Sequence, residues 1–249
     1  MIKTQQRPVA IVTGASSGIG QAIAQHLSNA GYDLALCARR RDRLTAMVKD
    51  LEANDSAVLA QTVDLRDEAQ ILNFFAAVDE RFGRLDVLIN NAGLGHKEPL
   101  MTGSTDAWRE TLEVNVLALC ICTREAVQRM TPANSGHIVH ISSMSGHRVP
   151  AIAGIYSATK FAVRSLGETL RRELRAAQSN IRISSVSPGI VETEFAEKYH
   201  QSAEKAQETY SQFPVLQADD IAKSVIYLLQ QPQHVEVNDI LIRPTQQSS

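Results

Sequence analysis

Short apolar runs alternate along the chain with longer stretches whose apolar residues recur at helical spacing, and this alternation predicts the architecture. We predict a strand in each of seven runs, at residues 9–14, 34–38, 57–64, 85–90, 137–142, 181–187 and 239–243. Helical patterns lie between them, at residues 18–30, 40–53, 67–82, 105–131, 156–177 and 218–230. Several of the strands are apolar nearly throughout, which is typical of strands that helices cover on both faces.

Strand alternating with helix predicts one doubly wound, seven-stranded parallel sheet with helices on both faces, because right-handed crossovers place the helices there. No linker, repeat or low-complexity segment divides the chain, so we predict a single α/β domain over residues 1–249. Residues 190–216 depart from the alternation: this long, polar, helix-prone segment lies between the sixth strand and the last helix. It is either a solvated insertion or a lid. We favour a lid, because connections at the carboxyl ends of parallel strands border the ligand crevice.

Composition and charge exclude several classes of function. Hydrophobic residues make up 44% and charged residues 21% of the chain, and the net charge of −2 gives no electrostatic basis for binding nucleic acid or an anionic membrane. No apolar stretch approaches the ~18 residues of a membrane span, and the first residues lack the apolar segment of a secretory signal. The three cysteines cannot all pair, and neither Cys-x-x-Cys nor paired histidines are present. We therefore predict a cytoplasmic protein without a metal site.

A glycine-rich loop follows the first predicted strand. Gly14, Gly18 and Gly20 lie where that strand gives way to the first helix, with the spacing G-x-x-x-G-x-G. Glycine permits a sharp turn and lets a pyrophosphate approach the main chain, and the helix N-terminus offers free N–H groups to the anion. A lysine at the end of the loop, as in nucleotide triphosphatases, is missing from this sequence. The loop therefore predicts a dinucleotide site.

Two arginines follow the second predicted strand, where a dinucleotide fold recognises the adenosine ribose. Arg39 and Arg40 stand at its carboxyl end, whereas Asp33 stands at its start, the wrong end for a contact with the ribose. A carboxylate at the carboxyl end would bind the 2′-hydroxyl of NAD, while arginine accommodates the 2′-phosphate of NADP. We therefore predict NADP(H) as the cofactor.

Candidate catalytic residues gather in two later segments. Tyr156 and Lys160 are four residues apart in a predicted helix, hence on one face, and a nearby ammonium lowers the pKa of a phenol. Ser142 and Ser143 end the fifth predicted strand at the rim of the crevice, where a hydroxyl can hold a substrate oxygen. Asn115 is polar amid apolar helical neighbours; it is either a helix-distorting amide bonded to backbone, a functional group, or both.

In their order and spacing these residues resemble the short-chain dehydrogenase/reductase family. The matching segments are TGASSGIG at 13–20, VDL at 63–65, NNAG at 90–93, Asn115, Ser143, YSATK at 156–160 and SPGIVET at 187–193. The segments NVLALCICTREA, SMSGHRV, RRELR and IRPTQQ look like an NADP-using subgroup of carbonyl reductases that includes a vertebrate cytosolic keto-steroid reductase and insect farnesol dehydrogenases. The resemblance implies a Rossmann-type fold and hydride transfer between NADP(H) and a small carbonyl or alcohol substrate.

The resemblance also implies a role for each residue. Tyr156 acts as general acid and base, Lys160 lowers its pKa, Ser143 orients the substrate oxygen, and Asn115 positions a water in the proton relay. Gly14, Ser16, Ser17, Gly18, Ile19, Gly20, Asp64, Leu65, Asn91, Val191 and Thr193 join Arg39, Arg40, Tyr156 and Lys160 as cofactor-binding residues. Because Ser16 and Ser17 stand where many NADP-preferring members carry a cation, NADP preference rests on Arg39 and Arg40.

Other possibilities stay open. Phe195, Tyr199, Tyr210 and Phe213 in the predicted lid either face an apolar ligand or fix the lid to the body. Lys97, Arg148 and Lys198 lie in the same variable loops and can bind a carboxylate, so a 3-hydroxy acid dehydrogenase is the alternative to an apolar-carbonyl reductase. A catalytically silent NADP sensor does not need all four catalytic residues, and a methyltransferase leaves the glycine loop unexplained. Small residues on the helix of Tyr156 (Ser157, Ala158 and Ala162) favour a homodimer or homotetramer.

Overall fold

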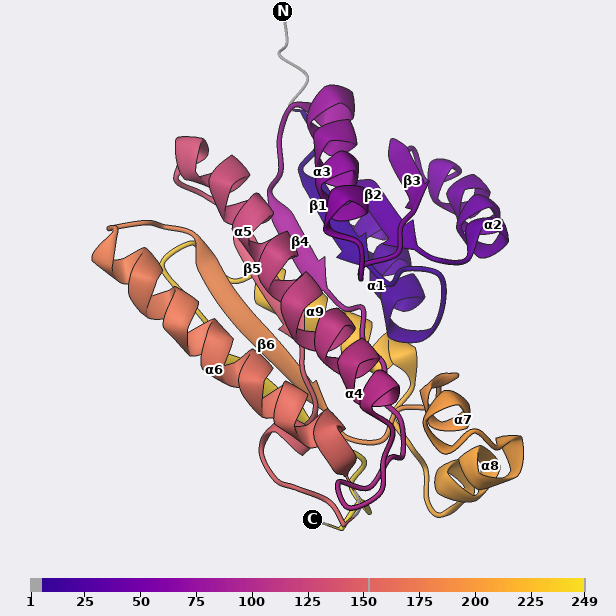
Figure 1. The fold of residues 1–249 in the computed structure, drawn as a ribbon. Helices are drawn as coiled ribbons and strands as arrows, with labels where there is room; N and C mark the ends of the chain where they lie inside the picture. The colour runs from indigo at the N-terminus through magenta and orange to yellow at the C-terminus, as the bar shows by residue number, and fades with distance from the viewer. Residues whose placement is uncertain (1–5, 152, 249) are drawn as a thin grey trace, which may run out of the picture.

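The computed structural model describes residues 6–151 and 153–248, which form a seven-stranded parallel sheet with the order β3-β2-β1-β4-β5-β6-β7 (Figure 1). The strands are β1 (Val9–Thr13), β2 (Asp33–Ala38), β3 (Val58–Thr62), β4 (Val87–Asn90), β5 (His137–Ile141), β6 (Arg182–Pro188) and β7 (Asp239–Ile242). All seven lie within or beside the predicted runs, so the predicted doubly wound, Rossmann-type sheet is confirmed. Residues 1–5, 152 and 249 of the predicted domain lie outside the described residues.

Helices cover both faces of the sheet. The described α-helices are α1 (Gly18–Asn29), α2 (Arg41–Glu52), α3 (Glu68–Phe82), α4 (Thr105–Leu112), α5 (Ala118–Met130), α6 (Gly154–Ala176), α7 (Phe195–His200), α8 (Ala203–Ser211) and α9 (Ala218–Leu229). One layer holds α3, α4, α5 and α6, and the other holds α1, α2 and α9 (Figure 1). The described helices include none that is long and apolar enough to cross a membrane.

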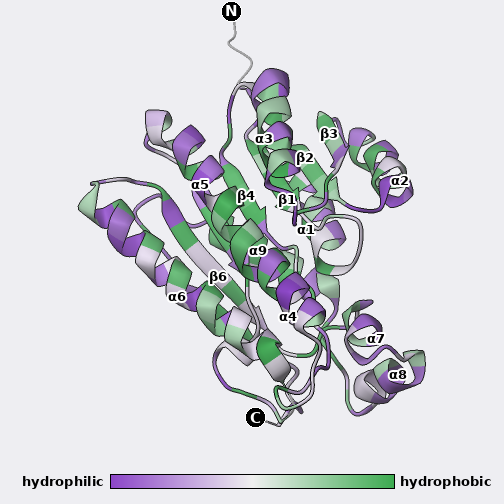
Figure 2. Cartoon of the chain, in the orientation of Figure 1, coloured by the Kyte–Doolittle hydropathy of each residue, from purple (hydrophilic) through white to green (hydrophobic). Residues whose placement is uncertain are grey.

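The apolar strand residues divide between two cores because successive side chains point to opposite faces. Ala10 and Val12 of β1 pack with α1, α2 and α9, while Val9 and Ile11 pack with α3, α5 and α6. Figure 2 shows hydrophobic residues along β1, β2 and β4 in the centre and hydrophilic residues along the outer helices. Burial on both faces explains why the strands are apolar nearly throughout.

One helical segment differs from the predicted pattern, while the helix-prone residues 190–216 agree with it. The stretch predicted as one helix over residues 105–131 contains a π-helical turn, Glu113–Leu117, between α4 and α5. Residues 190–216 contain two short helices, α7 and α8, which lie beside the carboxyl ends of the central strands (Figure 1). In a π-helical turn the backbone hydrogen bonds join residues five apart instead of four. Hydrophobic periodicity over so few residues does not reveal this change.

Candidate active site

A cavity of about 1140 Å³ lies at the carboxyl edge of the sheet, between the strand ends and residues 190–216, a segment that we name the lid after its predicted role. It is lined by these predicted site residues: Gly14, Ser16, Ser17, Gly18, Ile19, Gly20, Arg39, Arg40, Asp64, Leu65, Asn91, Ser143, Tyr156, Lys160, Val191 and Thr193. Asn115 lies behind the wall and is 2% exposed. The fold therefore brings together segments that are widely separated in the sequence.

The glycine loop keeps the backbone open at one end of this cavity. Gly14 and Gly18 adopt φ values of +65° and +54°, which favour glycine. A Cβ on Gly20 would lie 2.4 Å from Asn91 Nδ2 and 2.5 Å from the Gly14 carbonyl oxygen. Ser17 precedes α1 without capping it through its side chain, so the first N–H groups of α1 are not taken by that hydroxyl. This backbone fits the pyrophosphate of a dinucleotide.

Asn91 supports the loop from the end of β4. Its Nδ2 donates hydrogen bonds to the carbonyl oxygens of Thr13 and Gly14, at 2.9 and 3.2 Å. The family resemblance assigns Asn91 to the cofactor-binding residues. The contacts in the structure show that its amide also fixes the position of the glycine loop.

Arg40 reaches the glycine loop from the end of β2. Its Nε donates to Ser16 Oγ at 3.2 Å, and its Nη2 donates to Ser17 Oγ. Arg39 lies 3.6 Å from Glu110 Oε1 and is more exposed. Asp33 lies at the opposite end of β2, paired in register with Val9, and its carboxylate accepts a hydrogen bond from the Ala57 N–H. The cations, and not this carboxylate, therefore line the cavity beside the glycine loop.

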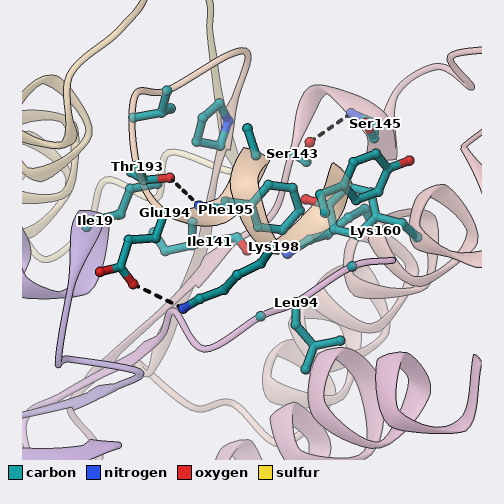
Figure 3. Close-up of a pocket in the computed structure, with 18 of the residues that line it drawn as sticks. Ile19, Leu94, Ile141, Ser143, Ser145, Lys160, Thr193, Glu194, Phe195 and Lys198 are labelled. Carbon is teal, nitrogen blue, oxygen red and sulfur yellow. Dashed lines mark hydrogen bonds and ion pairs between the residues drawn. The ribbon is translucent and has the colours of Figure 1, made fainter. Parts of the chain in front are cut away.

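Tyr156 and Lys160 lie on one face of α6, and the Lys160 Nζ is 5.7 Å from the centroid of the Tyr156 ring. Lys160 is 5% exposed, and its ammonium donates to the Ile141 carbonyl oxygen at 3.0 Å. Burial lowers the pKa of Lys160 to about 8. Ser143 follows β5, accepts a hydrogen bond from the Ser145 N–H at 3.0 Å, and points into the same region (Figure 3).

The pKa of Tyr156 is raised to about 12, mainly by burial; a hydrogen bond with Ser143 opposes the rise and the neighbouring Tyr199 adds to it. This pKa lies above the ordinary value of a phenol because Phe195 and Tyr199 pack on the ring, while the Lys160 ammonium donates to Ile141. The Tyr156 hydroxyl is thus protonated at neutral pH, as a general acid must be. The expectation that Lys160 lowers the pKa of Tyr156 stays a prediction.

Asn115 lies in the π-helical turn and joins it to the loop after β4. Its Oδ1 accepts from the Leu94 N–H at 2.9 Å, and its Nδ2 donates to the Leu94 carbonyl oxygen at 2.7 Å and to Thr159 Oγ1 at 3.1 Å. The expectation of an amide bonded to backbone in a distorted helix is confirmed. Since Leu94 lines the cavity, Asn115 also fixes one of its walls.

Aromatic side chains of the lid pack on Tyr156. The ring centroids of Phe195 and Tyr199 lie 5.3 and 6.1 Å from that of Tyr156, and the two lid rings stack on each other at 5.7 Å. A Cβ on Gly95 would lie 2.8 Å from Tyr156 Cδ2. Tyr210 has a different role, because its hydroxyl donates to the Thr193 carbonyl oxygen at 2.6 Å and so joins α8 to the first residues of the lid. Phe213 is not among the described residues that line the cavity.

Sequence reasoning missed contacts that depend on distant segments. Gln247 Oε1 accepts from the Ile190 N–H at 3.0 Å, and Ser248 also lines the cavity. Glu194 accepts from Arg40 Nη1 at 2.6 Å. Glu194 directly follows the matched segment that ends at Thr193, but no motif predicts its partner. An acidic residue so near a predicted anion site was the one feature of the sequence that could have indicated this contact.

Comparison with known proteins agrees with this geometry. Residues 8–204 match the family model for short chain dehydrogenase. Dehydrogenase/reductase SDR family member 11 of Homo sapiens is 45% identical over 246 residues, covering 96% of this chain and 95% of the relative. Farnesol dehydrogenase of Aedes aegypti is 39% identical over 241 residues, covering 95% of each chain. The closed form of a serine dehydrogenase complexed with NADP+ has a TM-score of 0.91 at 30% identity, covering 97% of this chain and 96% of that one.

The chain therefore belongs to the short-chain dehydrogenase/reductase family, and the resemblance inferred from its motifs is confirmed. It is an NAD(P)-dependent oxidoreductase that acts on CH–OH groups of small molecules. Within the family, it is similar over nearly its whole length to the human family member 11 and to the mosquito farnesol dehydrogenase.

Proposed function

We propose that this protein transfers a hydride between NADP(H) and a fairly apolar ketone, aldehyde or secondary alcohol of steroid-like or terpenoid-like character. The observation that carries the proposal is the position of Tyr156. Its phenol lies beside Ser143 and Lys160 and beneath the rings of Phe195 and Tyr199, in a cavity that continues to the glycine loop.

Each residue has a step in the mechanism. The nicotinamide supplies the hydride when it is bound. Tyr156 protonates the carbonyl oxygen in reduction and takes the proton back in oxidation, while the Ser143 hydroxyl holds the same oxygen. Lys160 places a positive charge beside the phenol, and Val191 and Thr193 would hold the carboxamide group of the nicotinamide. The lid rings exclude water, which strengthens the electrostatic interactions at the reacting carbon.

The preference for NADP rests on Arg39 and Arg40. Both guanidinium groups lie at the adenosine end of the cavity, and guanidinium groups bind phosphate in a fork geometry that an ammonium cannot match. The serine dehydrogenase of similar fold is complexed with NADP+, which supports the proposal. Arg39→Ala combined with Arg40→Ala should raise the KM for NADPH at least tenfold and change the KM for NADH little. Equal effects on both cofactors would mean that these arginines are structural.

A 3-hydroxy acid dehydrogenase is the second candidate. Lys97 and Arg148 line the cavity, and a serine dehydrogenase has the TM-score of 0.91 given above. Lys198 is less suited to a substrate carboxylate, because its Nζ donates to Glu194 at 3.1 Å. Phe195 and Tyr199 against Tyr156 support the apolar substrate instead.

A paired assay distinguishes the two candidates. The rate of reduction with NADPH is measured for steroid ketones, terpenoid aldehydes and diketones, and the rate of oxidation with NADP+ for terpenoid alcohols and 3-hydroxy acids. The rate of oxidation is then compared for one hydroxy acid and its methyl ester. If the pocket is apolar, the ester should be oxidised as efficiently as the acid or more so. A strong preference for the free acid that is lost in Lys97→Ala would establish the hydroxy acid dehydrogenase instead.

We also propose that residues 1–249 form one domain that assembles as a homodimer or homotetramer in a reducing, cytoplasmic environment. Leu117 and Phe161, on the layer that contains α6, are 56% and 39% exposed. Of the small residues on α6, Ser157 is buried within the chain, so Ala158 and Ala162 are left to approach a second subunit. Light scattering coupled to size-exclusion chromatography measures the assembly, and a monomeric mass would refute it.

A further inference from the structure

The carboxylate of Glu194, at the start of the lid, lies among three cations. Its Oε2 accepts from Arg40 Nη1 at 2.6 Å and from Lys198 Nζ at 3.1 Å, and its Oε1 accepts from Arg43 Nη1. Figure 3 shows Glu194 and Lys198 joined in this way at one side of the pocket. The hydrogen bond from Arg40, followed by those from Arg43 and Lys198, lowers the pKa of Glu194 to about 2. The lid therefore carries a fixed negative charge at this point.

The same contacts involve all three nitrogens of the Arg40 guanidinium. Its Nε donates to Ser16, its Nη2 to Ser17 and its Nη1 to Glu194. These bonds use three of its five N–H groups, so a phosphate that binds the two remaining N–H groups, one on each Nη, lies beside these acceptors. Of the three, only Glu194 is an anion, so it is the acceptor that a second anion repels most strongly.

In the sequence, Glu194 lies between Thr193 and Phe195, two residues that line the cavity. Thr193 is so close to the glycine loop that its Cγ2 would be 3.1 Å from a Cβ on Gly18. Phe195 follows and places its ring 5.3 Å from that of Tyr156. A displacement of the Glu194 carboxylate would therefore act on the backbone that carries both neighbours.

We propose that Glu194 is an internal competitor of the 2′-phosphate: its carboxylate occupies Arg40 and Arg43 in the cofactor-free protein, and a 2′-phosphate displaces it and releases the start of the lid. The inference rests on the proposed NADP preference, since NAD has no 2′-phosphate. Glu194 then sets how strongly the protein distinguishes the two cofactors, and it couples the adenosine end of the site to the lid.

Direct binding tests the competition without any turnover. The dissociation constants of 2′,5′-ADP, which carries the 2′-phosphate, and of 5′-AMP, which lacks it, are measured by calorimetry for the wild type and for Glu194→Gln. The variant should bind 2′,5′-ADP roughly fivefold or more tightly than the wild type does, within the usual range of coupling between sites, and 5′-AMP within twofold. Glu192→Gln is the matched control, because Glu192 accepts from Gln217 Nε2 at 2.9 Å outside the cation cluster. It should bind both ligands as the wild type does.

Hydrogen exchange of residues 195–211 tests the coupling to the lid. In the wild type, 2′,5′-ADP should speed exchange there and 5′-AMP should not, whereas Glu194→Gln should exchange fast without ligand. If the wild type binds 2′,5′-ADP no better than 5′-AMP, the NADP proposal itself fails. If it does distinguish them but Glu194→Gln binds 2′,5′-ADP equally or more weakly, the competition is refuted and the NADP proposal stands. If 2′,5′-ADP leaves hydrogen exchange in the lid unchanged, the coupling is refuted.

Discussion

Replacing Asn115 with alanine should destabilise the protein as well as slow it. The substitution removes three hydrogen bonds, two to the backbone of Leu94 and one to the hydroxyl of Thr159. Each is worth about 1 kcal/mol net, because folding exchanges bonds with water for bonds within the protein. The Thr159 hydroxyl keeps its own donation to the Tyr156 carbonyl oxygen at 2.7 Å, so no further penalty is expected there. The loss in the free energy of unfolding is therefore about 3 kcal/mol.

Thermal unfolding of the cofactor-free protein at fixed concentration measures this loss. For a chain of this size 1 kcal/mol lowers the Tm by about 2–4 °C, so Asn115→Ala should lower the Tm by about 6–12 °C. Asn54→Ala is a suitable control, since this exposed amide bonds only to Asn29 in the described structure and its removal should cost within about 0.5 kcal/mol. A Tm lowered by less than about 2 °C together with a large loss of turnover would refute the reasoning, because Asn115 would then act only in the proton relay.

Three further predictions concern the reacting groups and the glycine loop. Tyr156→Phe should still bind cofactor, measured by calorimetry, while turnover falls by ~10²–10⁴; near-normal turnover would exclude Tyr156 as the general acid. Gly20→Ala should abolish binding of 2′,5′-ADP with the fold retained by circular dichroism, because its Cβ would meet the Gly14 carbonyl oxygen at 2.5 Å; unchanged affinity would contradict the close packing. Because the pKa of Tyr156 is raised to about 12, the phenol stays protonated from pH 6 to 9. In this range kcat/KM for reduction should not fall through loss of this proton. The rate of oxidation, which needs the phenolate, should rise with pH. A fall in the reductive rate with an apparent pKa near 7 that is absent from Tyr156→Phe would refute this assignment.

The sheet was predictable because each parallel strand is buried on both faces and therefore reads as an apolar run. The glycine loop and the Tyr156–Lys160 pair were predictable for a related reason: each lies within one short segment whose local geometry fixes the relation between its residues. Their roles stay predictions until variants are measured.

The rest depended on contacts between distant segments. Arg40 and Glu194 are 154 residues apart, and Asn115 meets a backbone 21 residues before it, so neither partner could be read from spacing. The raised pKa of Tyr156 could not be predicted, because the residues that pack on its ring, Phe195 and Tyr199, follow some forty residues later in the chain. A local pair of polar groups can be seen in a sequence, but desolvation by distant residues cannot.

The position of Gln247 has a practical consequence for handling the protein. Its side chain holds the Ile190 N–H, and Ser248 accepts from Arg148 Nη2 at 3.3 Å, so the last described residues form part of the cavity wall. A purification tag fused at this end of the chain would follow closely after residues that line the cavity and hold the first residues of the lid. The amino end of β1 lies at the opposite edge of the sheet (Figure 1). Fusions placed before Met1 should therefore leave the kinetics unchanged, whereas fusions at the other end should alter KM for bulky substrates first.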